Sequence, residues 1–592
     1  MHILTCLTFM AIFYGVCIFG ICCDGGAQRV KNLYCDFSFW EKIALRVAVV
    51  FVVSFVFYWA KQDRFIYYWD YAFYWTTSIS RMNYIFEHSF GECFLSLWNS
   101  INVQDYSDVL QSVIALPMKL FGYTRISYVI YNYVLFFVPT MLVQGLIATK
   151  IVSKSGIRLP IAYIIAVFAA AFFQANYYAG LHNLIDIGYL LPMSVAMYLF
   201  IDYDFKRISL SRNIAISLCL ILAWIARRYT IYFIIGFVVA MLIKAFAVMI
   251  LDKRIWKTIT ADFLIIGGCS LSIFLILFRD FFLHALLTDY GFMYSAYDAP
   301  LSQKVAEVLA TFGGSTFVII AIVGILCFLN KVNRVQFVCM CSMMIAESMM
   351  FWRVQSMGIH HRMILNLPIF ICFIMLLDFW KGKNGKVHIR NIIIIGCALL
   401  QLLNFSSAFI PEFQINRKGS FFAERYYPYR RNDLEAISEL DEKLNLLTAG
   451  TSDCIYTAAS SGVICDSILQ CVNEPYQQRA VPNMIDGSHV DLRDGFPTAF
   501  LEAKYVVAAT PTQTHLLTGQ EVVIYLSESV RDKSTCIGRH FEKIYEIGLD
   551  DGVVAEIYEK ISDFTNDDLA EIRNHFNNLY PGQTELFDDR IR

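Results

Sequence analysis

The sequence predicts an α-helical, multi-pass membrane protein with a soluble α/β domain at its C-terminal end. Three observations point to this fold class. The chain of 592 residues is 57% hydrophobic and only 17% charged. Apolar runs long enough to cross a bilayer, for which about 20 residues are needed, recur from the N-terminus to residue 410. The rest of the chain, residues 411–592, is polar and long enough to bury a core of its own.

Twelve segments of residues 1–410 are predicted to span the membrane. The first lacks the basic N-terminal region and the small-residue cleavage site of a signal peptide, so we expect a retained helix. The sixth and seventh are separated only by Arg227-Arg228-Tyr229 and would otherwise form one long helix. The predicted spans are residues 3–22, 43–60, 126–149, 159–176, 185–202, 213–226, 230–250, 259–281, 305–329, 335–352, 361–378 and 391–410.

The charges of the connecting loops favour twelve spans. Lys and Arg residues collect in the short cytoplasmic loops of membrane proteins. With twelve spans all the basic loops fall on one face, whereas fusing residues 213–250 would move the last three to the other face. We therefore expect a plasma-membrane protein with both termini and the C-terminal domain outside the cytoplasm. The basic loops contain Arg29/Lys31, Lys150/Lys154/Arg158, Lys206/Arg207/Arg212, Lys253/Arg254/Lys257, Lys331/Arg334 and Lys381/Lys383/Lys386/Arg390.

Asp70 is the most unusual ionisable residue on the opposite, external face. It lies among seven aromatic residues in the segment 67–75, just past the second predicted span. A carboxylate at the end of a membrane helix is costly, and aromatic rings mark the membrane–water interface. We expect Asp70 to be held where a lipid head group and a water-borne substrate can meet. An interfacial aromatic belt with an incidental acid is the alternative.

The first external loop, residues 61–124, is predicted to contain two amphipathic helices along the outer membrane surface. Apolar residues recur at helical spacing in 82–98 and again in 109–116, before Pro117. Such helices lie in the interface with the apolar side toward lipid. A re-entrant segment or a packed core helix would show the same pattern.

These features resemble the GT-C superfamily of membrane glycosyltransferases, such as the dolichyl-phosphate-mannose-dependent mannosyltransferases. The resemblance rests on Trp69-Asp70-x3-Tyr74-Trp75, on the loop helices, and on two external segments, Arg227-Arg228-Tyr229 and Arg353-x-Gln355-x4-His360-His361-Arg362. It covers the architecture of the whole chain, but its motifs are short. No strict DxD or ExD pair is recognised in the sequence, and one extra span precedes the long first loop.

The resemblance implies a transferase that moves a sugar from a polyprenyl-phosphate donor to an acceptor in the cell envelope. The acceptor would be a polysaccharide, a glycolipid or a protein. An acceptor hydroxyl needs a base as it attacks the anomeric carbon, and Asp70 is the candidate for a single, inverting displacement. No metal ligands are assigned, although a divalent cation remains open as a cofactor. Membrane lipid is a further partner, and no nucleic-acid motif is present.

The leaving phosphate would need fixed positive donors, which guanidinium groups provide in a bidentate geometry. For each Arg the alternative is a side chain that extends to lipid head groups. His182 and Asp186 are four residues apart, as on one helix face, whereas two adjacent histidines on a helix would point about 100° apart. The residues expected at the donor phosphate are Arg227, Arg228, Tyr229, Arg353 and Arg362, and those expected at the substrates are Tyr74, Trp75, His182, Asp186, Gln355, His360 and His361.

Two other functions fit a polytopic membrane protein. A flippase or transporter for a lipid-linked saccharide would need polar groups in the middle of several spans, and the predicted spans are mostly apolar. A membrane-bound O-acyltransferase would depend on a membrane histidine, His360 or His361, and would not depend on Asp70.

The C-terminal domain is predicted to alternate strands and helices, which favours a small α/β fold. Strands are expected at residues 454–458, 505–509, 522–526 and 553–558, with a helix at 432–447. The charged segment 486–497 is expected to form an ordered loop.

Overall fold

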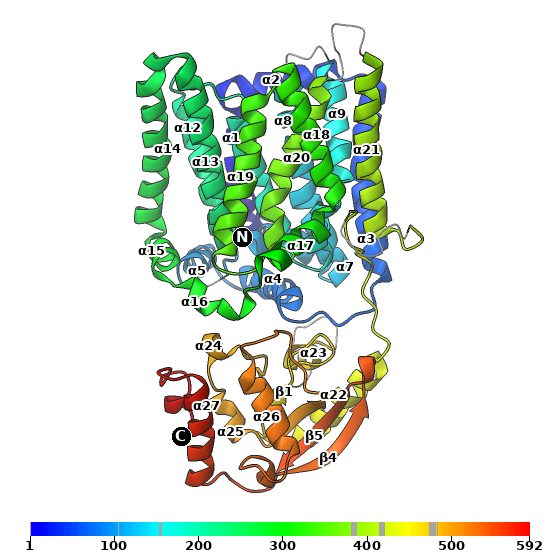
Figure 1. Ribbon diagram of the computed structural model, residues 1–592, viewed down its shortest axis with the longest axis vertical. Coiled ribbons are helices and arrows are strands. Elements are labelled where there is room, and N and C mark those ends of the chain that lie inside the picture. The colour runs from blue at the N-terminus through cyan, green and yellow to red at the C-terminus, as the bar shows by residue number, and fades with distance from the viewer. Residues whose placement is uncertain are drawn as a thin grey trace. The chain divides into compact units, whose positions relative to one another are not determined.

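The computed structural model describes residues 2–104, 106–152, 157–379, 387–413, 421–472, 481 and 483–592 (Figure 1). The chain divides into two compact units. The larger unit comprises Met1–Gln62, Tyr74–Thr288 and Ala299–Pro428. The smaller unit comprises Tyr429–Arg592 together with two short segments from earlier in the chain, Asp63–Phe73 and Asp289–Asp298.

The larger unit is built from helices, many of which run side by side in Figure 1. Helices occupy all twelve segments that were predicted to span a membrane. Within the described residues, eight helical segments have the length and hydropathy needed to cross a bilayer. The main helices are α1 (His2–Cys22), α3 (Phe39–Gln62), α7 (Arg125–Asn132), α8 (Val138–Ile151), α9 (Leu159–Ala171), α11 (Leu190–Phe200), α12 (Leu210–Ala226), α13 (Ile231–Leu251), α14 (Trp256–Leu277), α18 (Gly314–Asn330), α19 (Arg334–Trp352), α20 (Asn366–Met375) and α21 (Val387–Phe409).

Shorter helices connect these elements. Three of the apolar helices, α9, α11 and α12, are shorter than the others. Lys154 and the predicted basic loop 381–386 lie outside the described residues. The connecting helices of the larger unit are α2 (Gly26–Asp36), α10 (Tyr178–Leu181), α15 (Arg279–Leu287) and α17 (Leu301–Phe312), with 3-10 turns η1 (Cys23–Gly25), η5 (Ile185–Tyr189), η6 (Arg228–Thr230) and η9 (His361–Leu365).

The break between α12 and α13 occurs at the predicted place. Arg227 is extended, with φ −151° and ψ 118°, and the next three residues form the η6 turn before α13 begins. Residues 213–250 are therefore two helices, as the distribution of basic loops required.

The predicted single span at 305–329 is wrong in one respect, because it is two helices, α17 and α18, bent by 85°. Gly313 lies at the bend with φ +77°. A Cβ atom at this position would lie 2.6 Å from the Asn404 side chain and 2.7 Å from the Ala423 backbone nitrogen. Only glycine adopts this conformation readily and also fits the space.

Residues 61–124, the predicted first external loop, contain three helices instead of the predicted two. They are α4 (Asp70–Glu87), α5 (Phe90–Asn102) and α6 (Val109–Phe121). The predicted helix at 82–98 divides because the Ser89 side chain caps α5 and Glu92 returns a hydrogen bond to the Ser89 backbone. This capping box starts a new helix although the apolar spacing continues through it.

A five-stranded sheet forms the centre of the smaller unit, in the order β2-β1-β3-β5-β4. Strands β1 (Ile455–Ala458), β2 (Met484–Ile485) and β3 (Tyr505–Thr510) are parallel, whereas β5 (Val554–Lys560) and β4 (Phe541–Gly548) are antiparallel to their neighbours. Apolar cores form on both faces, as in a layered α/β fold. The helices are α16 (Tyr290–Met293), α22 (Leu434–Thr448), α23 (Asp466–Gln470), α24 (Asp491–Asp494), α25 (Thr498–Glu502), α26 (Glu521–Arg531) and α27 (Asn566–Leu579).

The predicted strand at 522–526 is wrong, because this segment belongs to helix α26. Its β-branched composition suggested a strand, but Val522, Val523, Leu526 and Val530 are buried at helical spacing. A strand that was not predicted, β4, lies at the edge of the sheet, and most of its residues, including Glu542, Lys543 and Glu546, are exposed.

Candidate functional site

A buried polar cluster lies at the end of the larger unit where α12 gives way to α13. We call it the Asp186 cluster, and it comprises Asp186, Tyr189, Arg227, Tyr229, His360 and His361. The break after α12 supplies Arg227 and Tyr229, the turn η5 supplies Asp186 and Tyr189, and the segment that enters η9 supplies the two histidines. Five of these six residues were predicted site residues, and the structure brings them together.

An ion pair forms the centre of the cluster. Arg227 Nε donates to Asp186 Oδ1 at 2.7 Å, and the side chains are 7% and 0% exposed. The Tyr229 hydroxyl donates to the same carboxylate oxygen. The second oxygen, Asp186 Oδ2, has no hydrogen-bond partner among the described residues. A buried pair of this kind must stay intact, because removing one partner leaves an uncompensated charge.

The two histidines pack against each other and against the tyrosines. Their ring centroids are 3.9 Å apart and the ring planes are inclined by 51°. Gly358 N–H donates to His361 Nδ1 at 3.1 Å. Burial, with the positive charges of Arg227 and Arg362, lowers the pKa of His360 to about 3, so this imidazole is neutral at pH 7.

Tyr74 and Trp75 have different positions. The Arg227 guanidinium lies over the Tyr74 ring at 4.5 Å, so Tyr74 extends the Asp186 cluster through a cation–π contact. Trp75 is fully buried, and its indole N–H donates to the Tyr123 carbonyl at 2.9 Å. Trp75 therefore anchors helix α4 and does not line the cluster.

The remaining predicted phosphate ligands are dispersed. Arg362 forms an ion pair with Glu307 at 3.2 Å and donates to the Thr311 hydroxyl at 2.8 Å. Arg228 donates to the Gln104 carbonyl. Arg353 is exposed at the C-terminal end of α19. Gln355 follows that helix, and its backbone N–H donates to the Phe351 carbonyl at 3.2 Å.

His182 does not join Asp186, contrary to the prediction that they share one helix face. Helix α10 ends at Leu181, and Asn183 adopts a left-handed conformation with φ +67°, so no continuous helix connects the two residues. The His182 ring is fully buried and contacts Tyr426 and the Tyr178 carbonyl. His182 is thus a structural residue between α10 and the segment that follows α21.

Asp70 belongs to the smaller unit and is the first residue of α4. The preceding Trp69 contacts loops that follow the parallel strands. Its backbone N–H donates to Ser467 Oγ at 2.9 Å, and its indole N–H donates to Ser488 Oγ at 3.1 Å. In open α/β sheets, ligands bind at the carboxyl ends of the strands. Asp70 therefore lies next to the edge of the domain where a ligand is expected.

Within the smaller unit, the charge of Asp70 acts on Tyr297, which belongs to a further polar group. Arg493 binds Asp494 through two contacts of 2.7 Å and donates to the Tyr297 hydroxyl at 3.2 Å. Burial raises the pKa of Tyr297, and the charges of Arg493, Asp494 and Asp70 act on the same phenol. The segment 289–298 thus brings Tyr297 to the Arg493–Asp494 pair, and the charge of Asp70 reaches the same tyrosine.

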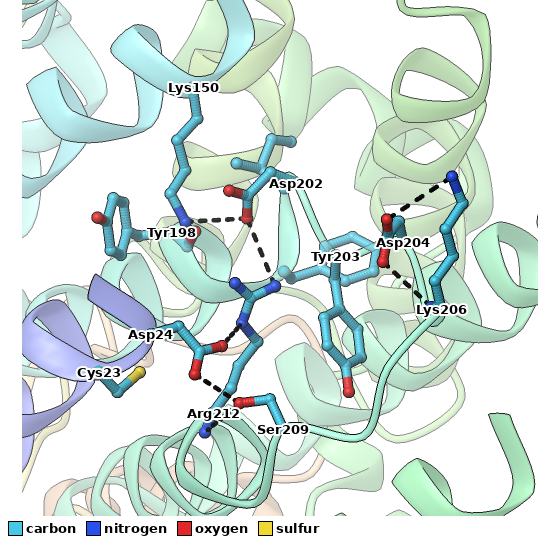
Figure 2. A network of polar contacts seen from close by, with 12 residues as sticks. Cys23, Asp24, Lys150, Tyr198, Asp202, Tyr203, Asp204, Lys206, Ser209 and Arg212 are labelled. Atoms are coloured by element: carbon cyan, nitrogen blue, oxygen red, sulfur yellow. Dashed lines mark hydrogen bonds and ion pairs between the residues drawn. The ribbon is translucent and has the colours of Figure 1, made fainter. Parts of the chain in front are cut away.

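A second charged network lies at the other end of α11 and α12 (Figure 2). Lys150 Nζ contacts Asp202 Oδ1 at 2.9 Å, and Arg212 contacts Asp24 at 2.6 Å and Asp202 at 3.8 Å. Ser209 Oγ also donates to Asp24, at 2.6 Å. Lys150 and Arg212 come from predicted basic loops. Contrary to the prediction that a DxD pair is absent, Asp202-Tyr203-Asp204 is such a sequence, and its Asp202 contacts the two basic side chains.

Among the described residues, no group of three or more His, Cys, Asp or Glu side chains has the arrangement of a metal site. The chain matches no known protein family and no curated protein in the comparisons made. The function has to be argued from the residues themselves.

Sequence reasoning missed several residues of these sites. Tyr189 donates to the His360 carbonyl at 3.3 Å and thereby joins η5 to the histidine segment. Glu307 neutralises Arg362, and its i, i+4 spacing to Thr311 on an amphipathic helix was a usable signal. Arg493 and His515 carried no signal, because their contacts with Tyr297 and Trp69 depend on tertiary folding.

Proposed function

We propose that this protein is an integral-membrane glycosyltransferase of the GT-C type. It would move a sugar from a polyprenyl-phosphate donor to an acceptor outside the cytoplasm, with inversion at the anomeric carbon. Twelve spans in a plasma membrane, with both termini extracytoplasmic, complete the proposal. They correspond to the eight long apolar helices, the bent pair α17–α18 and the shorter helices α9, α11 and α12.

The setting of Asp70 carries the proposal. The carboxylate belongs to the first residue of α4, so the helix fixes its position. It is partly exposed, its charge acts on Tyr297, and the preceding Trp69 contacts segments that follow the parallel strands. A general base for an acceptor hydroxyl needs access to the acceptor and a fixed position.

The positive residues divide into two groups in this proposal. Asp186 neutralises Arg227, and Glu307 neutralises Arg362. In this proposal the two arginines therefore have structural roles and supply no net charge to a phosphate. Arg353 is exposed and, among the described residues, has no ion pair, which makes it the best candidate for the leaving phosphate. Arg228 completes the phosphate set.

The test uses the purified protein in proteoliposomes with a panel of radiolabelled polyprenyl-phosphate sugars. Asp70→Asn should lower transfer at least about a hundredfold, because it removes the base, while the amount of folded protein stays unchanged. The matched control is Asp63→Asn, in the same segment, which should keep most of the activity. Full activity of Asp70→Asn would exclude Asp70 as the base, and a wild-type protein that uses no donor would contradict the proposal itself.

A carrier for a lipid-linked saccharide is the second candidate, and one residue favours it. Glu347 of α19 is fully buried within a candidate span, and neither carboxyl oxygen has a partner among the described residues. Isolated acids in spans often mark transport pathways. Movement of a lipid-linked saccharide across vesicles without product formation would support this function. Loss of that movement in Glu347→Gln would assign the residue to it.

A further inference from the structure

Trp69, the residue before Asp70, has an unusual backbone conformation. Its φ angle is +46°, in the left-handed region that residues other than glycine seldom adopt. A bulky residue stays there only when its surroundings impose it, and such residues concentrate at functional sites. Trp69 is also the start of α4, because its carbonyl accepts hydrogen bonds from Ala72 at 3.0 Å and from Phe73 at 2.8 Å.

Residues of the C-terminal domain impose this conformation. Ser467 accepts the Trp69 backbone N–H and Ser488 accepts its indole N–H. Ser488 in turn donates to Asp466 Oδ1 at 2.5 Å, and Asp466 is only 5% exposed. The His515 ring packs on the indole with ring centroids 4.5 Å apart. We call this set of Trp69, Asp466, Ser467, Ser488 and His515 the Trp69 clamp.

The clamp combines contacts from three separate loops. Asp466 and Ser467 begin α23 after β1, Ser488 follows β2, and His515 follows β3. The hydrogen bond to the Asp466 carboxylate is stronger than a bond between neutral groups and orients the Ser488 hydroxyl so that it accepts from the indole. Two hydrogen bonds and one ring contact therefore determine both the backbone and the side chain of Trp69.

We propose that the C-terminal domain positions Asp70 through the Trp69 clamp, with Trp69, Ser488 and Asp466 as positioning residues. This inference rests on the proposed function of Asp70 as the base. Since the first turn of α4 is bonded to the Trp69 carbonyl, a fixed Trp69 fixes the carboxylate one residue later. A catalytic group displaced by about 1 Å can lose about a hundredfold in rate.

The first experiment needs no substrate. Hydrogen–deuterium exchange of the full-length protein in detergent would follow the peptide that contains residues 70–73. Ser488→Ala should raise exchange at the Ala72 and Phe73 amides at least about tenfold, and Ser488→Thr, which keeps the hydroxyl, should restore slow exchange. Ser534→Ala, at an exposed serine that contacts only Asp532 among the described residues, is the matched control. Unchanged exchange in Ser488→Ala would overturn the clamp.

The second experiment separates positioning from folding. In the transfer assay, Ser488→Ala and Trp69→Phe should lower kcat about 10- to 100-fold with KM for the donor within about twofold, and Ser488→Thr should restore kcat. Faster exchange with normal kcat would overturn the positioning role. Absence of transfer in the wild-type protein would overturn the proposed function and with it the catalytic meaning of the clamp, whereas the exchange data would still decide whether the clamp exists.

Discussion

The two charged networks of the larger unit lie at opposite ends of α11 and α12 and differ in how their charges are satisfied. At one end, Asp202 contacts both Lys150 and Arg212, and Asp24 contacts Arg212 and Ser209 (Figure 2). These acids are 32% and 23% exposed. At the other end, Asp186 is fully buried and has one charged partner, Arg227.

We therefore expect the network around Asp202 and Asp24 to tolerate substitutions and the Asp186–Arg227 pair not to tolerate them. Charges that share several partners and reach water contribute little individually. A buried pair depends on one contact, and each charge would be costly alone. The Asp186 cluster contains five of the predicted site residues, and it is the more sensitive of the two networks.

The largest expected effect follows from breaking the buried pair. Asp186→Asn leaves the Arg227 charge uncompensated, and the free energy of unfolding should fall by about 3–5 kcal/mol. Unfolding in mixed detergent micelles, followed by intrinsic fluorescence, would measure the change. Asp186→Leu combined with Arg227→Met removes both charges and should recover most of the stability. A double variant as unstable as Asp186→Asn would show that the pair is not the source of the effect.

In the smaller unit, the partly buried His515 allows the same comparison to be made for the pH dependence of stability. Burial lowers the pKa of His515 to about 4, against 6.5 for an ordinary histidine, and the charge of Arg493 acts in the same direction. The folded domain therefore disfavours the protonated ring. The contribution of neutral His515 to the free energy of unfolding is fully present above pH 6.5 and is lost as the pH falls toward 4. Between pH 7 and 5 the free energy of unfolding should fall by on the order of 1 kcal/mol more in the wild type than in His515→Gln. Equal pH dependence in both proteins would contradict the assignment.

Asp441 is the opposite case, a buried acid that has no basic partner in the part of the chain that the structure describes. It is 5% exposed, and one carboxyl oxygen has no hydrogen-bond partner among the described residues. Burial, aided by the charge of Glu442, raises its pKa to about 6. The contribution of Asp441 to the free energy of unfolding is therefore most favourable below pH 3.8 and becomes less favourable as the pH rises toward 6. Asp441→Asn should raise the free energy of unfolding at pH 7.5 by on the order of 1 kcal/mol, with no gain at pH 3.5. A gain that is independent of pH would point to another cause.

The smallest effect is expected in the network of Figure 2. Arg212→Gln should lower the free energy of unfolding by only about 1 kcal/mol, because Lys150 still neutralises Asp202. The loss should shrink in 0.5 M salt, since these groups are partly exposed and salt screens them. A loss as large as that of Asp186→Asn would remove the distinction between the two networks.

Much of the helical unit was predictable because the signals are local. The charges of Arg227-Arg228-Tyr229 end one apolar run and start another, and α12 and α13 separate there. The Gly313 bend was not predicted, because apolar composition continues across it and the cause is a close approach of Asn404 and Ala423. In the smaller unit, the β-branched composition of residues 522–526 predicted a strand. The segment is a helix instead, because its apolar residues pack on the sheet at helical spacing.

The site shows the same division. The residue types of the Asp186 cluster were recognised because ionisable groups are rare in an apolar chain. The pairing of His182 with Asp186 failed since spacing alone cannot show that Asn183 breaks the helix. The approach of Ser488 and His515 to Trp69 joins residues about 420 and 450 positions apart, and no local pattern encodes it.

The bend at Gly313 has a consequence for how this chain tolerates mutation. Ser315 N–H donates to the Phe421 carbonyl at 2.7 Å, and Ala423 N–H donates to Asn404 at 2.6 Å. Three segments that are distant in the sequence therefore pack around Gly313, where there is no space for a methyl group. A random screen for heat-sensitive alleles should find position 313 repeatedly, whereas alanine at Gly314, the first residue of helix α18, should have a smaller effect.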